Sequence, residues 1–134
     1  MESLKFITAG QPICNGTAGY ENAFKILEEL KLDGMELEFV HGVRMNPANK
    51  ELVKRIAAEK KMVLTAHGPY YINLNSKEED KIAASITRVL DTARIGKELG
   101  AYSVTYHAAF YMGMPADEVY KKVVHSMEEI FLTN

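Results

Sequence analysis

Cysteine is nearly absent from the sequence, since Cys14 is the only one among 134 residues. A single thiol cannot form an internal disulfide or a cysteine-based zinc site, so both are excluded as ways of stabilising the chain. A protein with this cysteine content is expected in a reducing cytoplasm. We interpret Cys14 itself as a small neutral residue of a loop.

Long apolar runs are absent too. No stretch approaches the roughly 20 apolar residues of a membrane-spanning helix, and the N-terminal MESLKF does not resemble a signal peptide. We therefore expect a soluble protein that is not exported and has no membrane partner. An excess of one charge is also missing, because 16 Lys and Arg face 18 Asp and Glu. This balance excludes a generally basic nucleic-acid coat.

Common catalytic signatures and linkers are missing as well. The chain has no G-x-G-x-x-G, P-loop, G-x-S-x-G or H-E-x-x-H pattern. It has no linker or low-complexity tract, and its length suits one domain of ordinary size. We expect residues 1–134 to form a single domain.

The sequence does contain one pattern that recurs four times. A short apolar stretch is followed by a loop with Gly, Pro or Asn and then by an amphipathic segment. The apolar stretches are centred near Phe6, Leu37, Leu64 and Val104. Strands that alternate with helices in this way predict parallel β/α units.

Helix signals accompany the amphipathic segments. Proline near a first helical position, in Asn46-Pro47 and Met114-Pro115, predicts the starts of the second and fourth helices. A first helix is expected over about 20–30. Ser76 and Glu79 predict a capping box for the third helix, and Gly100 its end. Helical faces are predicted for Ile82, Ile86, Val89, Leu90 and Ala93, and for Val119, Val123, Met127 and Ile130.

The predicted strands have one apolar and one polar face, because side chains alternate along a strand. The apolar face comprises Met35, Leu37, Phe39, Met62, Leu64, Ala66, Tyr102, Val104 and Tyr106. The opposite face includes Glu36, Glu38, Thr65, His67, Ser103, Thr105 and His107. Such a sheet has helices on one side only, as a barrel with a polar lumen does.

Two histidines are candidate metal ligands. We expect His67 and His107 each to end a strand on the polar face, where parallel α/β proteins collect their chemistry. Two imidazoles can share one zinc or another divalent transition metal, although catalytic zinc needs a third protein ligand. Glu36 and Glu38 are candidates for supporting groups around the metal. The alternative is that each histidine is only a hydrogen-bonded strand end.

The loops after these histidines are aromatic. HGPYYINLNS supplies Tyr70 and Tyr71, which can stack on a nucleobase, and Asn73 as a further group beside the metal. AAFYMGMP supplies Phe110 and Tyr111 after His107. These aromatic side chains can instead cover the core. Arg44 is a candidate for phosphate contact, whereas the basic residues of the second helix suit a solvated face.

The segment HGPYYINLNS, taken together with YHAAFY, resembles the endonuclease IV family of apurinic/apyrimidinic endonucleases, which are xylose isomerase-like TIM barrels. The stretches MELEFVHGVRM and DTARIGKELGA are similar to its shorter prokaryotic members. The resemblance implies an α/β fold of parallel (β/α) units, roughly the first half of a TIM (β/α)8 barrel. It also implies that His67 and His107 bind one of three zinc ions, that Tyr70 enters DNA, and that Arg44 lies near a DNA-contacting arginine.

The implied activity is hydrolysis of the phosphodiester 5′ to an abasic site in DNA base-excision repair. The family's other metal ligands come from strands five to eight, which this chain lacks, so the isolated chain should have reduced or no activity. The alternatives are a half-barrel binding module without catalysis and a sugar isomerase of the same superfamily. Abasic DNA is the expected partner, and open sheet edges predict self-association.

Overall fold

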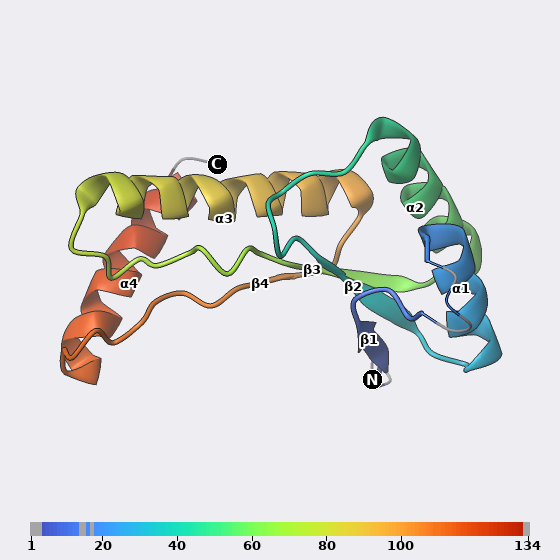
Figure 1. The fold of residues 1–134 in the computed structure, drawn as a ribbon, viewed down its shortest axis with the longest axis horizontal. Helices are drawn as coiled ribbons and strands as arrows, with labels where there is room; N and C mark the ends of the chain where they lie inside the picture. Colours follow the sequence, from blue (N-terminus) through green and yellow to red (C-terminus); the bar gives the residue numbers. More distant parts are fainter. Residues whose placement is uncertain (1–3, 14–15, 17, 133–134) are drawn as a thin grey trace.

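The computed structural model describes residues 4–13, 16 and 18–132, and Cys14 lies outside them. Strands and helices alternate along the chain, as the sequence pattern predicts (Figure 1). The elements are β1 (Ile7–Ala9), α1 (Tyr20–Glu29), β2 (Gly34–Glu38), α2 (Pro47–Lys60), β3 (Val63–His67), α3 (Glu79–Leu99), β4 (Val104–Thr105) and α4 (Ala116–Leu132).

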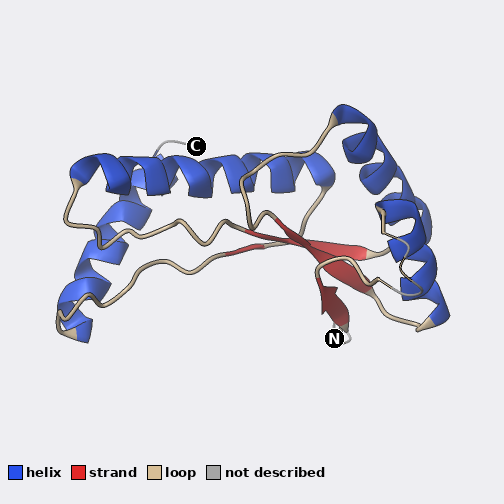
Figure 2. Ribbon diagram, in the orientation of Figure 1, coloured by secondary structure: helices blue, strands red, loops and turns tan. Residues whose placement is uncertain are grey.

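The four strands form one parallel sheet in the order β1-β2-β3-β4. The predicted fold class is therefore confirmed: the chain forms parallel β/α units of the N-terminal half of a TIM barrel. Figure 2 shows that β3 and β4 continue as long non-helical segments toward α4. The two segments lie side by side, since the Leu74 N–H donates to the carbonyl of Ala108 at 2.9 Å.

One face of the sheet is buried under helices, which confirms the predicted alternation in β2 and β3. The buried strand residues are Met35, Leu37, Leu64 and Ala66, and they pack with residues of α1, α2 and α3. The prediction for Tyr102 is wrong, because its side chain is 81% exposed. The Tyr102 N–H still donates to the Leu64 carbonyl at 2.7 Å, so its backbone lies beside β3 while its side chain faces solvent at the edge of the sheet.

The helix ends follow local hydrogen-bonding chemistry. Asn46 caps α2 by accepting a 2.8 Å hydrogen bond from the Asn49 N–H, and Gly100 ends α3 in a left-handed conformation, as expected. The predicted capping box of α3 is wrong. Ser76 Oγ accepts instead from the Glu78 N–H at 3.2 Å, within the turn that precedes the helix.

A second apolar cluster lies beneath the loop that follows β3. It contains Ile72 and Leu74 of that loop, Val89 and Leu90 of α3, and Ile130 of α4. The loop is therefore anchored on both long helices. Over the described residues, none of the helices combines the length and apolarity needed to cross a membrane.

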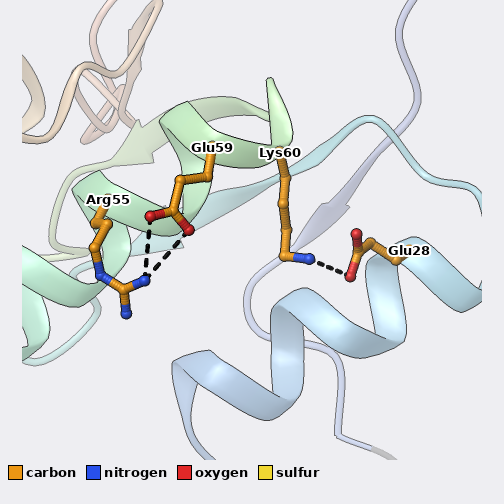
Figure 3. A network of polar contacts seen from close by, with 4 residues as sticks. All are labelled: Glu28, Arg55, Glu59 and Lys60. Atoms are coloured by element: carbon orange, nitrogen blue, oxygen red, sulfur yellow. Dashed lines mark hydrogen bonds and ion pairs between the residues drawn. The ribbon is translucent and has the colours of Figure 1, made fainter.

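The basic residues of α2 lie on a solvated face. Figure 3 shows Arg55 paired with Glu59 along the helix, and Lys60 paired with Glu28 of α1. Such exposed ion pairs contribute about 0–1 kcal/mol each. These charges therefore decorate the helix surface, as the sequence indicates.

Candidate functional site

His67 is the last residue of β3, as predicted, and lies partly buried on the polar side of the sheet. Its Nδ1 lies 2.8 Å from the carbonyl oxygen of Gly68. A carbonyl only accepts, so Nδ1 carries the proton and donates this bond. The neutral ring then has its lone pair on Nε2, which is the atom a metal would bind.

His107 lies two residues beyond the end of β4, so the prediction that it ends the strand is wrong. The short pairing of β4 with β3 explains the difference. The structure nevertheless brings the two histidines together. Their ring centroids are 5.4 Å apart, and the ring planes are inclined by 53°.

Tyr70 completes this cluster. Its ring stacks on His107 with centroids 5.6 Å apart and an interplanar angle of 22°, and it lies 6.1 Å from the ring of His67. The tyrosine is 57% exposed, so its outer surface is available for contact. Three residues selected from the sequence for related chemistry therefore meet at the carboxyl ends of β3 and β4.

The histidine pair fits part of a metal site. With zinc–nitrogen bonds of about 2.0–2.1 Å and tetrahedral angles, two ligating imidazoles have ring centres about 5 Å apart. The observed 5.4 Å is close to this separation. Within the described part of the chain, no group of three or more His, Cys, Asp or Glu side chains is arranged around a common metal position. The separation of the two rings therefore suits two ligands of one metal, and the described residues supply no third around the same position.

Further aromatic side chains surround the cluster. Tyr71 follows Tyr70, and Phe110 and Tyr111 follow His107; all are exposed. The residues on either side of Tyr70 and Tyr71 are anchored, since Pro69 and Ile72 are fully buried. Tyr70 and Tyr71 therefore project from a loop with buried flanking residues, and all four aromatic side chains are exposed rather than covering the core.

Two asparagines connect the loop after β3 with the loop after β4. The Oδ1 of Asn73 accepts from the Phe110 N–H at 3.2 Å and from the Asn75 N–H at 3.1 Å. The Nδ2 of Asn75 donates to the carbonyls of Phe110 at 2.9 Å and Tyr111 at 3.4 Å. Asn73, which the sequence places beside the metal, therefore links the two loops through hydrogen bonds. Asn75 received no role in the sequence analysis, because its partners lie 35 and 36 residues away.

The remaining predicted residues line a separate groove at the carboxyl ends of β1 and β2. Glu36, Glu38 and Arg44 lie there, in an open cavity of about 530 Å³. The sequence assigns no role to three other polar residues that line the groove, namely Gln11, Tyr20 and His41. All three lie in or just after the loops that follow β1 and β2, and this position is the sequence signal that could have indicated them.

The groove adjoins the histidine cluster through the sheet. Glu38 of β2 is the register partner of His67 in β3, so the two side chains lie on the same face. Glu36 accepts a long bond of 3.4 Å from the Thr65 hydroxyl. Burial raises the pKa of Tyr20, and a hydrogen bond with Gln11 partly offsets the effect. Tyr20 therefore stays a neutral hydrogen-bonding group near pH 7.

Residues 24–132 match the family model described as the xylose isomerase-like TIM barrel. The chain belongs to this family. An uncharacterized protein of Methanocaldococcus jannaschii is 34% identical over 130 residues, which cover 95% of this chain and 45% of the relative. The chain therefore spans about half the length of this relative.

Solved structures of differing activity share the fold. A D-tagatose 3-epimerase-like protein superposes with a TM-score of 0.71 at 15% identity, over 95% of this chain and 47% of its own. Endonuclease IV from Thermus thermophilus gives 0.65 at 16% identity, again over 95% and 47%. A D-psicose 3-epimerase gives 0.68 at 20% identity, over 85% and 42%. At 15–20% identity, these likenesses show a shared fold.

Proposed function

We propose that this chain forms the His67–His107 side of the metal site in an endonuclease IV-type enzyme, which cleaves DNA 5′ to abasic sites. The observation that carries the proposal is the stack of Tyr70 on His107, 5.6 Å between centroids, with His67 beside both. An exposed aromatic ring next to two metal-type imidazoles suits a planar group held beside a phosphodiester. In this proposal the remaining ligands come from the other half of the barrel.

Each residue has a defined task in this proposal. His67, through Nε2, and His107 hold the metal. Tyr70 and Tyr71 stack on bases or fill the gap left by a missing one. Arg44 contacts a phosphate. A bound divalent metal such as zinc supplies Lewis acidity and an activated water.

The Tyr70 assignment is tested by binding of duplex DNA that contains one abasic analogue, measured by fluorescence anisotropy. We expect Tyr70→Ala to weaken this binding by about 1–3 kcal/mol, the value of one base–aromatic stack. Binding of an undamaged duplex should change less. Tyr102→Ala is the matched control, since Tyr102 is also exposed but precedes β4, at the opposite end of the strand.

Equal affinity of the parent chain for damaged and undamaged duplexes would contradict the proposal. The same conclusion would follow if Tyr70→Ala and Tyr102→Ala had the same effect, because Tyr70 would then contribute only as a surface tyrosine.

A sugar isomerase or epimerase of the same family is the second candidate. The groove near β1 and β2 favours it, because Glu36, Glu38 and Gln11 offer hydrogen-bonding groups for hydroxyls within about 530 Å³. Nuclear magnetic resonance shifts on addition of D-fructose separate the two functions. Shifts confined to groove residues, without preference for abasic DNA, would favour the sugar enzyme. A binding module without catalysis would also bind DNA. It would not cleave DNA even when the other half of the barrel is present.

A further inference from the structure

Asn75 is a buried residue whose side chain supports a loop far away in the sequence. It is 1% exposed, and its Nδ2 donates to the Phe110 and Tyr111 carbonyls. Its Oδ1 is buried and has no hydrogen-bond partner among the described residues. Burying an amide costs free energy unless hydrogen bonds offset the cost. The two donated bonds are therefore what favours Asn75 in this position.

Other hydrogen bonds hold this loop on either side of His107, since the Gly68 N–H donates to the Thr105 carbonyl at 2.8 Å and the Phe110 N–H donates to Asn73 Oδ1 at 3.2 Å. β4 ends at Thr105, and α4 begins only at Ala116. Between them, Ala108 accepts from the Leu74 N–H at 2.9 Å, and the Tyr106 hydroxyl lies 2.6 Å from Met127 Sδ. The His107 ring thus depends on the backbone on either side of it for its position.

We propose that Asn75 is a positioning residue, which locks the loop after β4 onto the loop after β3 and so fixes His107 against Tyr70 and His67. This role rests on the proposed function, in which His67 and His107 bind a metal. Asn73 supports the same junction, because its Oδ1 accepts from both Asn75 and Phe110. The two aromatic loops then behave as one rigid unit around the histidines.

The test replaces Asn75 with leucine, which has a similar size but donates no hydrogen bond. Two quantities are measured on the 134-residue chain: zinc affinity by competition with a chromophoric chelator, and nuclear Overhauser contacts between the Tyr70 and His107 rings. Asn75→Ala removes the same donor without bulk and serves if the leucine variant does not fold.

We expect zinc affinity to fall about 10- to 100-fold, as for loss of a group that orients a metal ligand. The ring contacts between Tyr70 and His107 should weaken in the same variant. Asn46→Ala is the control, because Asn46 caps α2 through the Asn49 N–H and makes no described bond to either loop. This control should retain both the zinc affinity and the ring contacts.

Unchanged zinc affinity in Asn75→Leu would overturn the positioning role, whether or not the ring contacts change. Failure of the parent chain to bind zinc would instead count against the proposed function. The ring contacts, measured without metal, then decide the role of Asn75 alone: their loss supports it, and their retention overturns it.

Discussion

Gly34 is the residue least able to accept a side chain. A Cβ built there would lie 1.7 Å from the Val63 carbonyl oxygen and 2.7 Å from its carbonyl carbon, which are backbone atoms of the neighbouring strand. We expect Gly34→Ala to lower the free energy of unfolding by about 1–3 kcal/mol or more, through overpacking between β2 and β3. Chemical denaturation measures the change.

Gly96 provides the matched control for this substitution. A Cβ there meets Val104, Ala101 and Ala66 at 3.5–3.6 Å, which is ordinary contact. Alanine also favours the interior of a helix by about 0.8–1.0 kcal/mol over glycine. Gly96→Ala should therefore be neutral or stabilising, and equal losses in both variants would refute the account of strand packing.

The role of a single residue is predictable from the sequence when the groups that it contacts are near it along the chain. His67 is recognisable from the sequence because it ends an alternating strand, and Tyr70 because it lies three residues further on. Asn75 was missed because its importance comes from carbonyls of another loop, which no local pattern reveals. The position of Glu36 and Glu38 in a separate groove likewise depends on how β1 and β2 pair.

At the scale of elements, Asp33 ties the start of β1 to β2. Its carboxylate accepts from the Phe6 N–H at 2.8 Å and from Lys5 Nζ at 3.0 Å, and its backbone N–H donates to the Phe6 carbonyl. The backbone bond from Phe6 and then the pairing with Lys5 hold the pKa of Asp33 below its ordinary value of 3.8. The ionised carboxylate is therefore the form that supports this edge strand.

This arrangement predicts a pH dependence on the acid side. Because the folded-state pKa is depressed, the contribution of Asp33 is present above its unfolded pKa and is lost as pH falls through the folded value. The difference in unfolding free energy between the parent and Asp33→Asn should thus shrink on acidification. A nuclear magnetic resonance titration of the Asp33 carboxyl with a midpoint at or above 3.8 would contradict this explanation.

The elements also show where periodicity fails as a predictor. Apolar alternation located β2 and β3 because both have neighbours on each side, and burial then fixes which face each residue takes. β4 is an edge strand with two paired residues, so the same alternation overestimated its length. Before α3, the Ser76 hydroxyl oxygen accepts from the Glu78 N–H within a turn, so the expected capping box does not form.

At the scale of the whole molecule, the described sheet has two edge strands, β1 and β4. Exposed apolar side chains flank both: Leu4 and Phe6 precede β1, and Tyr102 precedes β4. Unpaired strand edges of this kind favour association. We expect the 134-residue chain to form dimers or larger assemblies at micromolar concentration, measured by light scattering. A stable monomer under these conditions would contradict the expectation.

The central claim is that His67 and His107 together bind a metal at the carboxyl ends of β3 and β4. Elemental analysis after dialysis against zinc tests it directly, with the parent chain compared to His67→Ala and His107→Ala. His125→Ala is the control, since His125 lies on α4 beside Glu129 and outside the cluster. The account predicts weak, partial zinc content in the parent and His125→Ala, and its loss in both other variants. Equal zinc content in all four proteins would contradict it.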